Sequence, residues 1–235
     1  MNLVIVESPA KAKTINKYLG KDYLVLASYG HIRDLPSKNG SVDPEKKFEM
    51  LWEIDSFSKK YLKEITDAAE DSKKIILATD PDREGEAIAW HVKEVLEKKK
   101  LLKDKHLERV VFNEITKKAI LDAIKNPRKI HLPLVEAYLA RRALDYLVGF
   151  NISPILWTKL PGSKSAGRVQ SVALKLITER EKEIELFNPE EYWTLSSNFT
   201  NKDNKDIISK LSLFNGEKVE RFTFKNKEEI NKALD

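Results

Sequence analysis

Residues 74–86 have the sequence KIILATDPDREGE, in which a short apolar run ends at a cluster of acidic side chains. The run over residues 74–78 is rich in β-branched residues, which is typical of a strand buried on both faces of a parallel sheet. A stripe of apolar residues at helical spacing follows over residues 88–96. The stretch therefore predicts a strand, a tight acidic loop and a helix, which is the repeating unit of an α/β fold.

The same alternation extends over the first 130 residues. Residues 2–6 (NLVIV) form an apolar run, and Ser8-Pro9 then predicts the start of a helix, because Ser is a favoured N-cap and Pro a favoured first helical residue. Further strands are expected at residues 23–27 and 110–112, and further helices over 57–68 and 116–126. This alternation predicts a parallel sheet with flanking helices and right-handed crossovers.

The pattern changes near residue 130. Residues 134–149 and 169–185 have a helical period, whereas residues 192–199 and 207–214 are typical of two strands joined by a polar loop. We therefore expect an α/β domain at residues 1–130, a small helical domain at 131–188 and the incomplete beginning of a β-rich domain at 189–235.

The composition favours a soluble, globular protein, with 41% hydrophobic and 34% charged residues. The sequence contains no cysteine, which excludes disulfides and fits a cytoplasmic location. We expect no export signal and no membrane segment, since no apolar run approaches the roughly 18 residues that a membrane helix needs. Residues 138–175 hold six Lys or Arg against one acid, Asp145, which indicates either contact with a phosphate backbone or a solvated basic surface.

Carboxylates follow two of the expected strands. Asp80, Asp82 and Glu84 alternate directly after one strand, and Glu7 ends another. If the two strands are neighbours, these acids converge at one edge of the sheet, where ligands of α/β folds bind. Oxygen ligands favour a hard cation such as Mg²⁺, which would neutralise phosphate charge during phosphoryl transfer. The alternative is that acids in a first helical turn merely complement the helix dipole.

A second group of side chains lies on one helix face. Tyr138, Arg142 and Asp145 are spaced i, i+4 and i+7. Such a set can stack on and hydrogen-bond an unpaired base, although an ordinary Arg–Asp pair beside a half-buried tyrosine has the same spacing. Ser165 and Gly167 precede the next helix, where free N–H groups would either face a phosphate or form a plain cap.

Several motifs together resemble those of bacterial type IA DNA topoisomerases. Glu7 after one strand and Asp80-Pro81-Asp82 after another resemble a Toprim domain, which is shared by topoisomerases, primases and some nucleases. The segments that narrow the resemblance to the topoisomerases are residues 6–13, 30–36, 80–91, 109–116 and 165–171.

The resemblance implies a role for each matching active-site residue. Glu7 matches an acid near the scissile phosphate that transfers a proton and contacts metal, and Lys11 matches a lysine that stabilises this phosphate. Asp80 and Asp82 match the main Mg²⁺ ligands, with Glu84 beside them. The resemblance also implies that His31 and Arg109 lie close to the active site.

The same resemblance implies a DNA-binding surface. Arg141, Arg142 and Asp145, with Tyr138 on the same face, match a helix that grips single-stranded DNA and recognises one base. Ser165, Arg168 and Gln170 lie in a segment that resembles a turn against the DNA backbone. The expected partner is DNA, with a preference for single strands, and the protein is expected to be a nucleoid-associated monomer. No ATP is expected to be needed, because no Gly-rich phosphate loop is present.

The sequence departs from the family pattern in one respect. The family cuts DNA with a tyrosine in a motif that ends in Met-Arg-Thr-Asp-Ser, and none of the seven tyrosines here stands in this motif. We therefore hypothesise that the chain is the N-terminal portion of an enzyme that relaxes negatively supercoiled DNA by Mg²⁺-dependent strand cleavage, passage and religation. This portion alone is expected to bind DNA and Mg²⁺ but not to cleave. The alternatives are a stand-alone Toprim module that binds nucleic acid without catalysis and, less favoured, a Toprim nuclease.

Two single residues complete the expectations. His91 falls on the apolar face of its helix and is expected to be a packed core residue rather than a ligand. Trp52, in the irregular region after residue 30, is the tryptophan expected to contact DNA.

Overall fold

The computed structural model describes residues 1–234. Its first unit is built on a four-stranded sheet with the strand order β2-β1-β7-β8, and every neighbouring pair is parallel. The strands are β1 (Asn2–Val6), β2 (Tyr23–Ala27), β7 (Lys74–Leu77) and β8 (His106–Arg109). The predicted parallel sheet is confirmed, with the two most buried strands, β1 and β7, at its centre.

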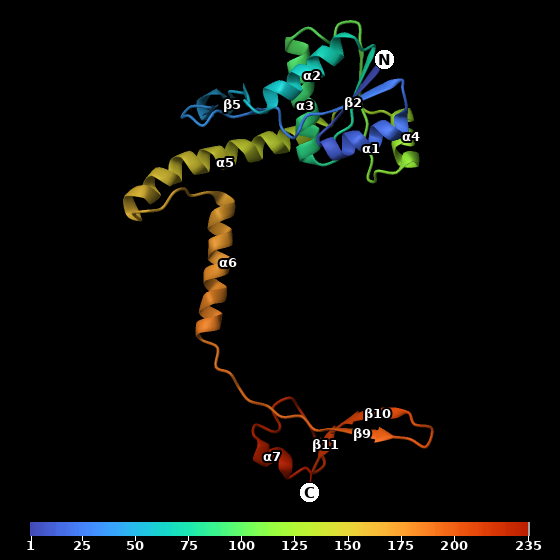
Figure 1. Cartoon of the computed structure of the whole chain (residues 1–235). Coiled ribbons are helices and arrows are strands. Elements are labelled where there is room, and N and C mark those ends of the chain that lie inside the picture. The colour runs from blue at the N-terminus through green and yellow to red at the C-terminus, as the bar shows by residue number, and fades with distance from the viewer. Residues whose placement is uncertain (235) are drawn as a thin grey trace. The chain divides into compact units, whose positions relative to one another are not determined.

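Helices cover both faces of this sheet (Figure 1). Helices α2 (Ser58–Glu70) and α3 (Arg83–Lys98) pack on one face, against Leu3 and Ile5 of β1. Helices α1 (Pro9–Leu19) and α4 (Lys117–Lys125) pack on the other face, against Val4 and Val6. The alternating side chains of β1 thus enter two different cores, which explains why its sequence is apolar from Leu3 to Val6.

The helix starts follow the capping residues in the sequence. Ser8 is the N-cap of α1 and accepts a hydrogen bond from Lys11 N, and Pro9 is the first helical residue. Thr116 caps α4 in the same way by accepting from Ala119 N. Both expected starts are confirmed.

One expected strand lies elsewhere. The strand predicted at residues 110–112 is instead β8, His106–Arg109, which pairs with β7 up to Leu77. Because β7 ends at Leu77, the chain beyond Arg109 has no strand to pair with, and Val110 contributes only a last hydrogen bond to Leu77 O before it enters the core. The apolar sequence after Arg109 therefore indicated a buried segment, whereas the residues that pair with β7 are the more polar residues 106–109.

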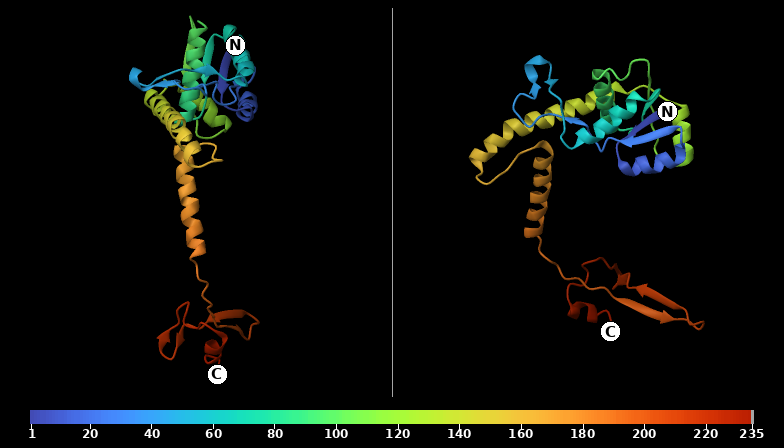
Figure 2. Two further views of the ribbon diagram at one scale, coloured as in Figure 1. Left: turned by 90° about the vertical axis from the view of Figure 1, so that its left-hand side faces the viewer. Right: turned by 45° about the horizontal axis from the view of Figure 1, so that its top comes forward.

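The region expected to be irregular forms two small hairpins, which lie beside α5 (Leu132–Lys159) in Figure 2. Leu35 and Val42 from this region pack against Ala143 and Tyr146 of α5. The hairpins consist of β3 (Arg33–Asp34) paired with β6 (Glu53–Ile54) and β4 (Val42–Asp43) paired with β5 (Glu49–Met50), with the 3-10 turn Pro44–Lys46 between β4 and β5.

Helix α5 joins the sheet to the region that follows it. It is 28 residues long, continues through Pro154, and packs along α3. The helix α6 (Arg168–Glu185) follows, so both expected helices are confirmed. Contacts divide the chain into two compact units, Met1–Ser171 and Val172–Asp235, which places α5 with the sheet. The domain boundaries at residues 130 and 188 stay predictions.

The second unit contains short antiparallel pairs. The expected hairpin is present as β9 (Ser196–Thr200) and β10 (Asp206–Lys210), followed by the pair β11 (Leu213–Phe214) and β12 (Glu217–Lys218) and by α7 (Lys227–Asn231). Phe224 and Ile230 are buried in this unit. Within residues 1–234, no helix is both long and apolar enough to cross a membrane.

Candidate active site and nucleic-acid cleft

Glu7 and Asp80 meet at the carboxyl edge of the sheet. Glu7 follows β1, and Asp80 follows the neighbouring strand β7. The ammonium of Lys11, one helical turn after Glu7, lies between them and donates to Asp80 Oδ1 at 2.5 Å and to Glu7 Oε1. The structure thus brings together the two strand ends and Lys11, the lysine for which the resemblance implies a contact with the scissile phosphate.

Lys11 carries the positive charge between these two carboxylates. Burial lowers the pKa of Lys11, but its hydrogen bonds with Asp80 and Glu7 outweigh this effect and raise the pKa above the usual value. Lys11 therefore stays an ammonium at neutral pH. The second oxygen of Glu7, Oε2, is buried, and none of residues 1–234 donates a hydrogen bond to it. This orphaned oxygen is an acceptor that a cation or a proton could satisfy.

The acidic loop is folded tightly onto the start of α3. Asp82 is the N-cap of α3 and accepts from Gly85 N at 2.8 Å, while the Thr79 hydroxyl donates to Gly85 O at 2.6 Å. A Cβ at residue 85 would lie 2.1 Å from Asp80 O. A glycine is therefore required at this position for the loop to close.

Glu84 is directed toward His31. Its Oε2 lies 3.3 Å from Nε2 of His31. In the part of the chain that the structure describes, no three His, Asp or Glu side chains are arranged to hold a metal ion. The carboxylates of Glu7 and Asp80 thus share Lys11, whereas those of Asp82 and Glu84 face other partners.

Arg109 lies beneath the loop. Its side chain is 1% exposed, and it donates to Asp80 O at 2.6 Å, to Thr79 O at 2.8 Å and to Glu86 Oε1 at 3.0 Å. Burial lowers its pKa from the usual value, although the charge of Glu86 opposes this shift. Arg109 therefore contacts the backbone of the loop, and no contact joins it to the carboxylates of Asp80, Asp82 or Glu7.

Glu86 is a residue of this region for which the sequence analysis predicted no role. Its side chain is fully buried, forms ion pairs with Arg109 and Arg128, and accepts a hydrogen bond from His131 N at 2.9 Å. Burial raises the pKa of Glu86, but these donors outweigh it and lower the pKa overall. One sequence signal could have found it: Glu86 directly precedes the apolar run 87–89 in the first buried turn of a helix.

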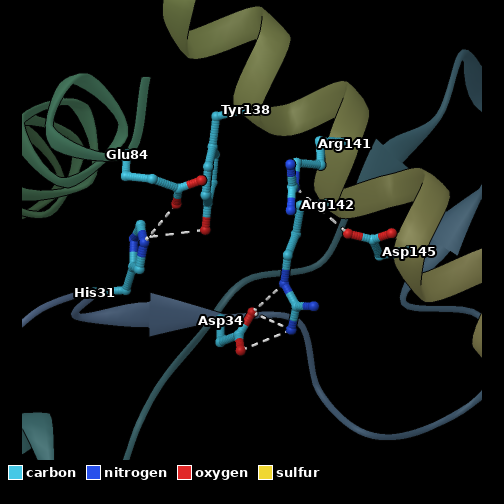
Figure 3. A pocket seen from close by; sticks show the side chains of 7 residues that line it. All are labelled: His31, Asp34, Glu84, Tyr138, Arg141, Arg142 and Asp145. Atoms are coloured by element: carbon cyan, nitrogen blue, oxygen red, sulfur yellow. Dashed lines mark hydrogen bonds and ion pairs between the residues drawn. The ribbon is translucent and has the colours of Figure 1, made fainter. Parts of the chain in front are cut away.

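A cleft of about 330 Å³ separates the loop from α5 (Figure 3). Arg142 and Asp34 form a two-pronged ion pair at 2.7 and 2.8 Å across it. On the loop side, the Tyr138 hydroxyl lies 3.5 Å from Nδ1 of His31. The residues that line the cleft are His31, Asp34, Glu84, Tyr138, Arg141, Arg142 and Asp145.

Tyr138 is mostly buried, and one face of its ring is stacked on His31, with 5.0 Å between the ring centroids. Burial, with the charge of Asp34, raises the pKa of Tyr138 to about 12. Of the three side chains expected to share a face, Arg142 and Asp145 are thus the more accessible at the cleft.

Asp145 connects α5 to the next helix. Arg168 binds it at 2.9 and 3.3 Å, and Arg141 lies 3.7 Å from it. The hydrogen bond from Arg168 lowers the pKa of Asp145, so this carboxylate is charged at neutral pH. Arg168, expected in a turn against DNA, therefore lies at the same cluster as the α5 residues.

A second groove, of about 630 Å³, continues along α5 and shares Arg142 and Asp145 with the cleft. Ser165 lines it, together with the aromatic rings of Tyr146, Phe150 and Trp157. Gln170 is exposed nearby, with its Nε2 at 3.5 Å from Ser165 Oγ. The expected DNA-binding residues thus lie along one continuous surface of the first unit.

His91 is fully buried, as expected for a core residue. It accepts a hydrogen bond from Arg33 Nε at 2.9 Å, and burial together with the charge of Arg33 lowers its pKa to about 2. Trp52 packs edge-on against His91, with 4.6 Å between ring centroids, and Arg33 lies 5.2 Å from the centre of the Trp90 ring. Trp52 is therefore part of an aromatic cluster; contact with DNA stays a prediction.

Comparisons with known proteins agree with this architecture. A Toprim domain family model matches residues 2–115, and a DNA topoisomerase family model matches residues 129–235. DNA topoisomerase 1 of Rickettsia felis is 59% identical over 230 residues, which cover 97% of this chain and 30% of that protein. DNA topoisomerase 1 of Zymomonas mobilis is 58% identical over 233 residues, which cover 99% of this chain and 19% of that protein.

A solved structure gives the same result. Full-length topoisomerase I from Thermotoga maritima matches with a TM-score of 0.73 and 41% identity, over 98% of this chain and 37% of that chain. The chain thus spans about 30% of the length of the Rickettsia felis relative. On the fold and these matches together, the chain belongs to the bacterial type IA DNA topoisomerase family and carries its Toprim domain.

Proposed function

We propose that this chain is the portion of a type IA topoisomerase that binds Mg²⁺ and grips a single DNA strand, in an enzyme that relaxes negatively supercoiled DNA by cleavage, strand passage and religation. The observation that carries the proposal is the contact of Glu84 with His31 at 3.3 Å. It joins the acidic loop to the cleft on α5, so a strand bound in the cleft would pass its phosphates beside the acids.

Mg²⁺ would be held by Asp80, Asp82 and Glu84, with Glu7 beside them. The donor set fits this ion, because all four side chains offer carboxylate oxygens and Glu7 Oε2 is buried without a donor. When bound, the ion would neutralise phosphate charge. Lys11 is a charged donor at the same place, suited to hold the scissile phosphate, while Glu7 is placed to hold or transfer a proton next to it.

The strand would lie along α5. Arg141, Arg142 and Arg168 offer guanidinium donors for phosphates or for a base edge, and Asp145 offers an acceptor for a base amino group. Ser165 and Gln170 would contact the backbone further along the groove. We propose that the protein works as a cytoplasmic, nucleoid-associated monomer without ATP.

The nucleophile would come from a tyrosine outside these residues. Tyr138, the tyrosine that lines the cleft, is a poor nucleophile, since burial raises its pKa to about 12. The chain alone is therefore expected to leave no covalent adduct with an oligonucleotide on a denaturing gel. An adduct would contradict this assignment.

Calorimetric titration with Mg²⁺ tests the metal site. The wild-type chain is expected to bind Mg²⁺, and a variant with both Asp80→Asn and Asp82→Asn is expected to bind at least about tenfold more weakly, as when ligand charge is removed. Asp71→Asn, at the exposed end of α2, is the matched control and should bind like wild type. Equal binding by the double variant would contradict the assignment of the ligands.

The second candidate is a Toprim module that binds nucleic acid without metal chemistry. It is favoured by one observation, the absence within residues 1–234 of three His, Asp or Glu side chains arranged around a common point. The same titration decides between the two, because this candidate predicts no specific Mg²⁺ binding while single-stranded DNA still binds.

A further inference from the structure

Glu86 lies where three elements of the first unit meet. It belongs to the first turn of α3, yet both of its carboxylate oxygens bind other elements. Oε1 accepts from Arg109 of β8 at 3.0 Å and also from Arg128, and Oε2 accepts from the backbone N–H of His131 at 2.9 Å. A fully buried carboxylate thus holds together the sheet edge, the segment after α4 and the start of α5.

The connection continues from Arg109 to the acidic loop. The guanidinium that binds Glu86 also donates to Asp80 O at 2.6 Å and to Thr79 O at 2.8 Å. Consecutive hydrogen bonds therefore run from the backbone of Asp80 through Arg109 and Glu86 to His131. The side chains of Arg109 and Glu86, in the middle of this series, are 1% and 0% exposed, so water does not compete for these hydrogen bonds.

The far end of this connection is the helix that lines the cleft. His131 is the N-cap of α5, and the following turns carry Tyr138, Arg141 and Arg142. A carboxylate at a helix N-terminus is favourable to the helix dipole and fixes the direction of the first turn. Because a helix moves as a rigid element, a displacement at its first turn also displaces the arginines further along.

We propose that Glu86 is a positioning residue that couples the acidic loop to α5, so that a divalent cation bound at the loop and a single strand bound along α5 change each other's affinity. The proposal rests on the proposed function for the two ligands and goes beyond it by assigning the coupling to a residue that contacts neither. Such coupling is reciprocal and typically amounts to about 5- to 150-fold.

A pair of substitutions at His131 separates coupling from stability. His131→Pro removes the N–H that Glu86 Oε2 accepts, together with the imidazole ring, and the φ of −84° at this residue is close to the value that proline imposes. His131→Ala keeps this N–H and removes the ring, whose Nδ1 accepts from Leu134 N at 3.3 Å. Glu86 and Arg109 stay paired in both variants, so a purely structural role of Glu86 predicts the same coupling in both.

The experiment titrates the full chain into a fluorescein-labelled single-stranded oligonucleotide, with and without saturating Mg²⁺. In wild type and His131→Ala, Mg²⁺ is expected to tighten oligonucleotide binding by about fivefold or more. In His131→Pro this ratio is expected to fall toward one, with the Mg²⁺-free affinity unchanged. A His131→Pro ratio equal to that of wild type would overturn the proposal.

The proposal and the proposed function fail differently. A wild-type chain that binds both ligands with a ratio of one overturns the coupling and leaves the proposed function standing, whereas a chain that binds neither ligand contradicts both. If His131→Pro does not fold, amide hydrogen exchange of the wild type decides. Mg²⁺ is expected to slow exchange at the amides of residues 131, 132, 134 and 135, which form no hydrogen bond with Asp80, Asp82 or Glu84. Unchanged exchange there would overturn the coupling.

Discussion

Gly85 and Asp80 are in backbone contact, with no room for a side chain between them: a Cβ at residue 85 would lie 2.1 Å from Asp80 O and 2.7 Å from Asp80 N. This contact folds the acidic loop onto the first turn of α3. It is the steric reason why a glycine follows the third acid of the loop.

The first prediction is that Gly85→Ala destabilises the chain by about 3 kcal/mol, since the backbone must shift to admit the methyl group. The displaced loop should also bind Mg²⁺ more weakly. Gly149→Ala within α5 is the control, because its Cβ would meet Ala166 O at an ordinary 3.8 Å; there we expect about 0.5–1 kcal/mol of added stability, as for Gly→Ala inside a helix. Urea denaturation measures both, and equal effects would contradict the steric account.

The second prediction concerns Glu86→Gln. The substitution leaves the buried Arg109 without its counter-charge, and losing one partner of a buried pair costs about 3–5 kcal/mol. Glu183→Gln removes the partner of Arg180 in an exposed pair and should cost at most about 1 kcal/mol. A loss for Glu86→Gln as small as that of the control would show that the buried network contributes little to stability.

The third prediction is the pH dependence of this network. The pKa of Glu86 is lowered in the folded chain, so it lies below the unfolded value of about 4.3. The ionised carboxylate therefore stabilises the fold above that value, and its contribution is lost as the pH falls through the folded pKa. The difference in free energy of unfolding between wild type and Glu86→Gln should shrink as the pH is lowered from about 5 toward 3. A difference that stays constant would mean that Glu86 does not carry the acid sensitivity.

The fourth prediction concerns His91, whose pKa is lowered to about 2 by burial and by Arg33. This value lies below the unfolded pKa of about 6.5, so the neutral ring stabilises the fold fully above about pH 6.5. The stabilisation is lost as the pH falls from there toward the folded pKa. In NMR titrations, the ring signals of His91 should stay constant from about pH 8 to about pH 5. A midpoint for His91 near the unfolded value would contradict its burial as a neutral ring.

The sequence was sufficient for features that depend on neighbouring residues. The strands at residues 2–6 and 74–77, the cap at Ser8 and the buried His91 follow from local apolar patterns and capping preferences, and the structure confirms them. The meeting of Glu7 with Asp80 needed one further assumption, that their strands are neighbours, which the strand order confirms.

Features that depend on distant partners could not be predicted in this way. Glu86 binds Arg128 and His131 across 42 and 45 residues of sequence, and no local pattern marks such partners. The two-residue strands between Arg33 and Ile54 are too short for a period, and they are stabilised by packing on Tyr146 of α5. Likewise, the ion pair of Arg142 with Asp34 spans 108 residues, so the helical spacing predicted the face on which Arg142 lies but not its partner.

The central claim is that a single strand binds along α5 beside the acidic loop. The most direct test titrates the chain into labelled single-stranded and double-stranded oligonucleotides at several salt concentrations, with Arg142→Ala in parallel and Arg180→Ala, on the exposed surface of α6, as control. We expect tighter binding to the single strand, weakening with salt, and a loss of about 1–3 kcal/mol in Arg142→Ala alone. Equal binding of both DNA forms, or an Arg142→Ala variant that binds like wild type, would contradict the claim.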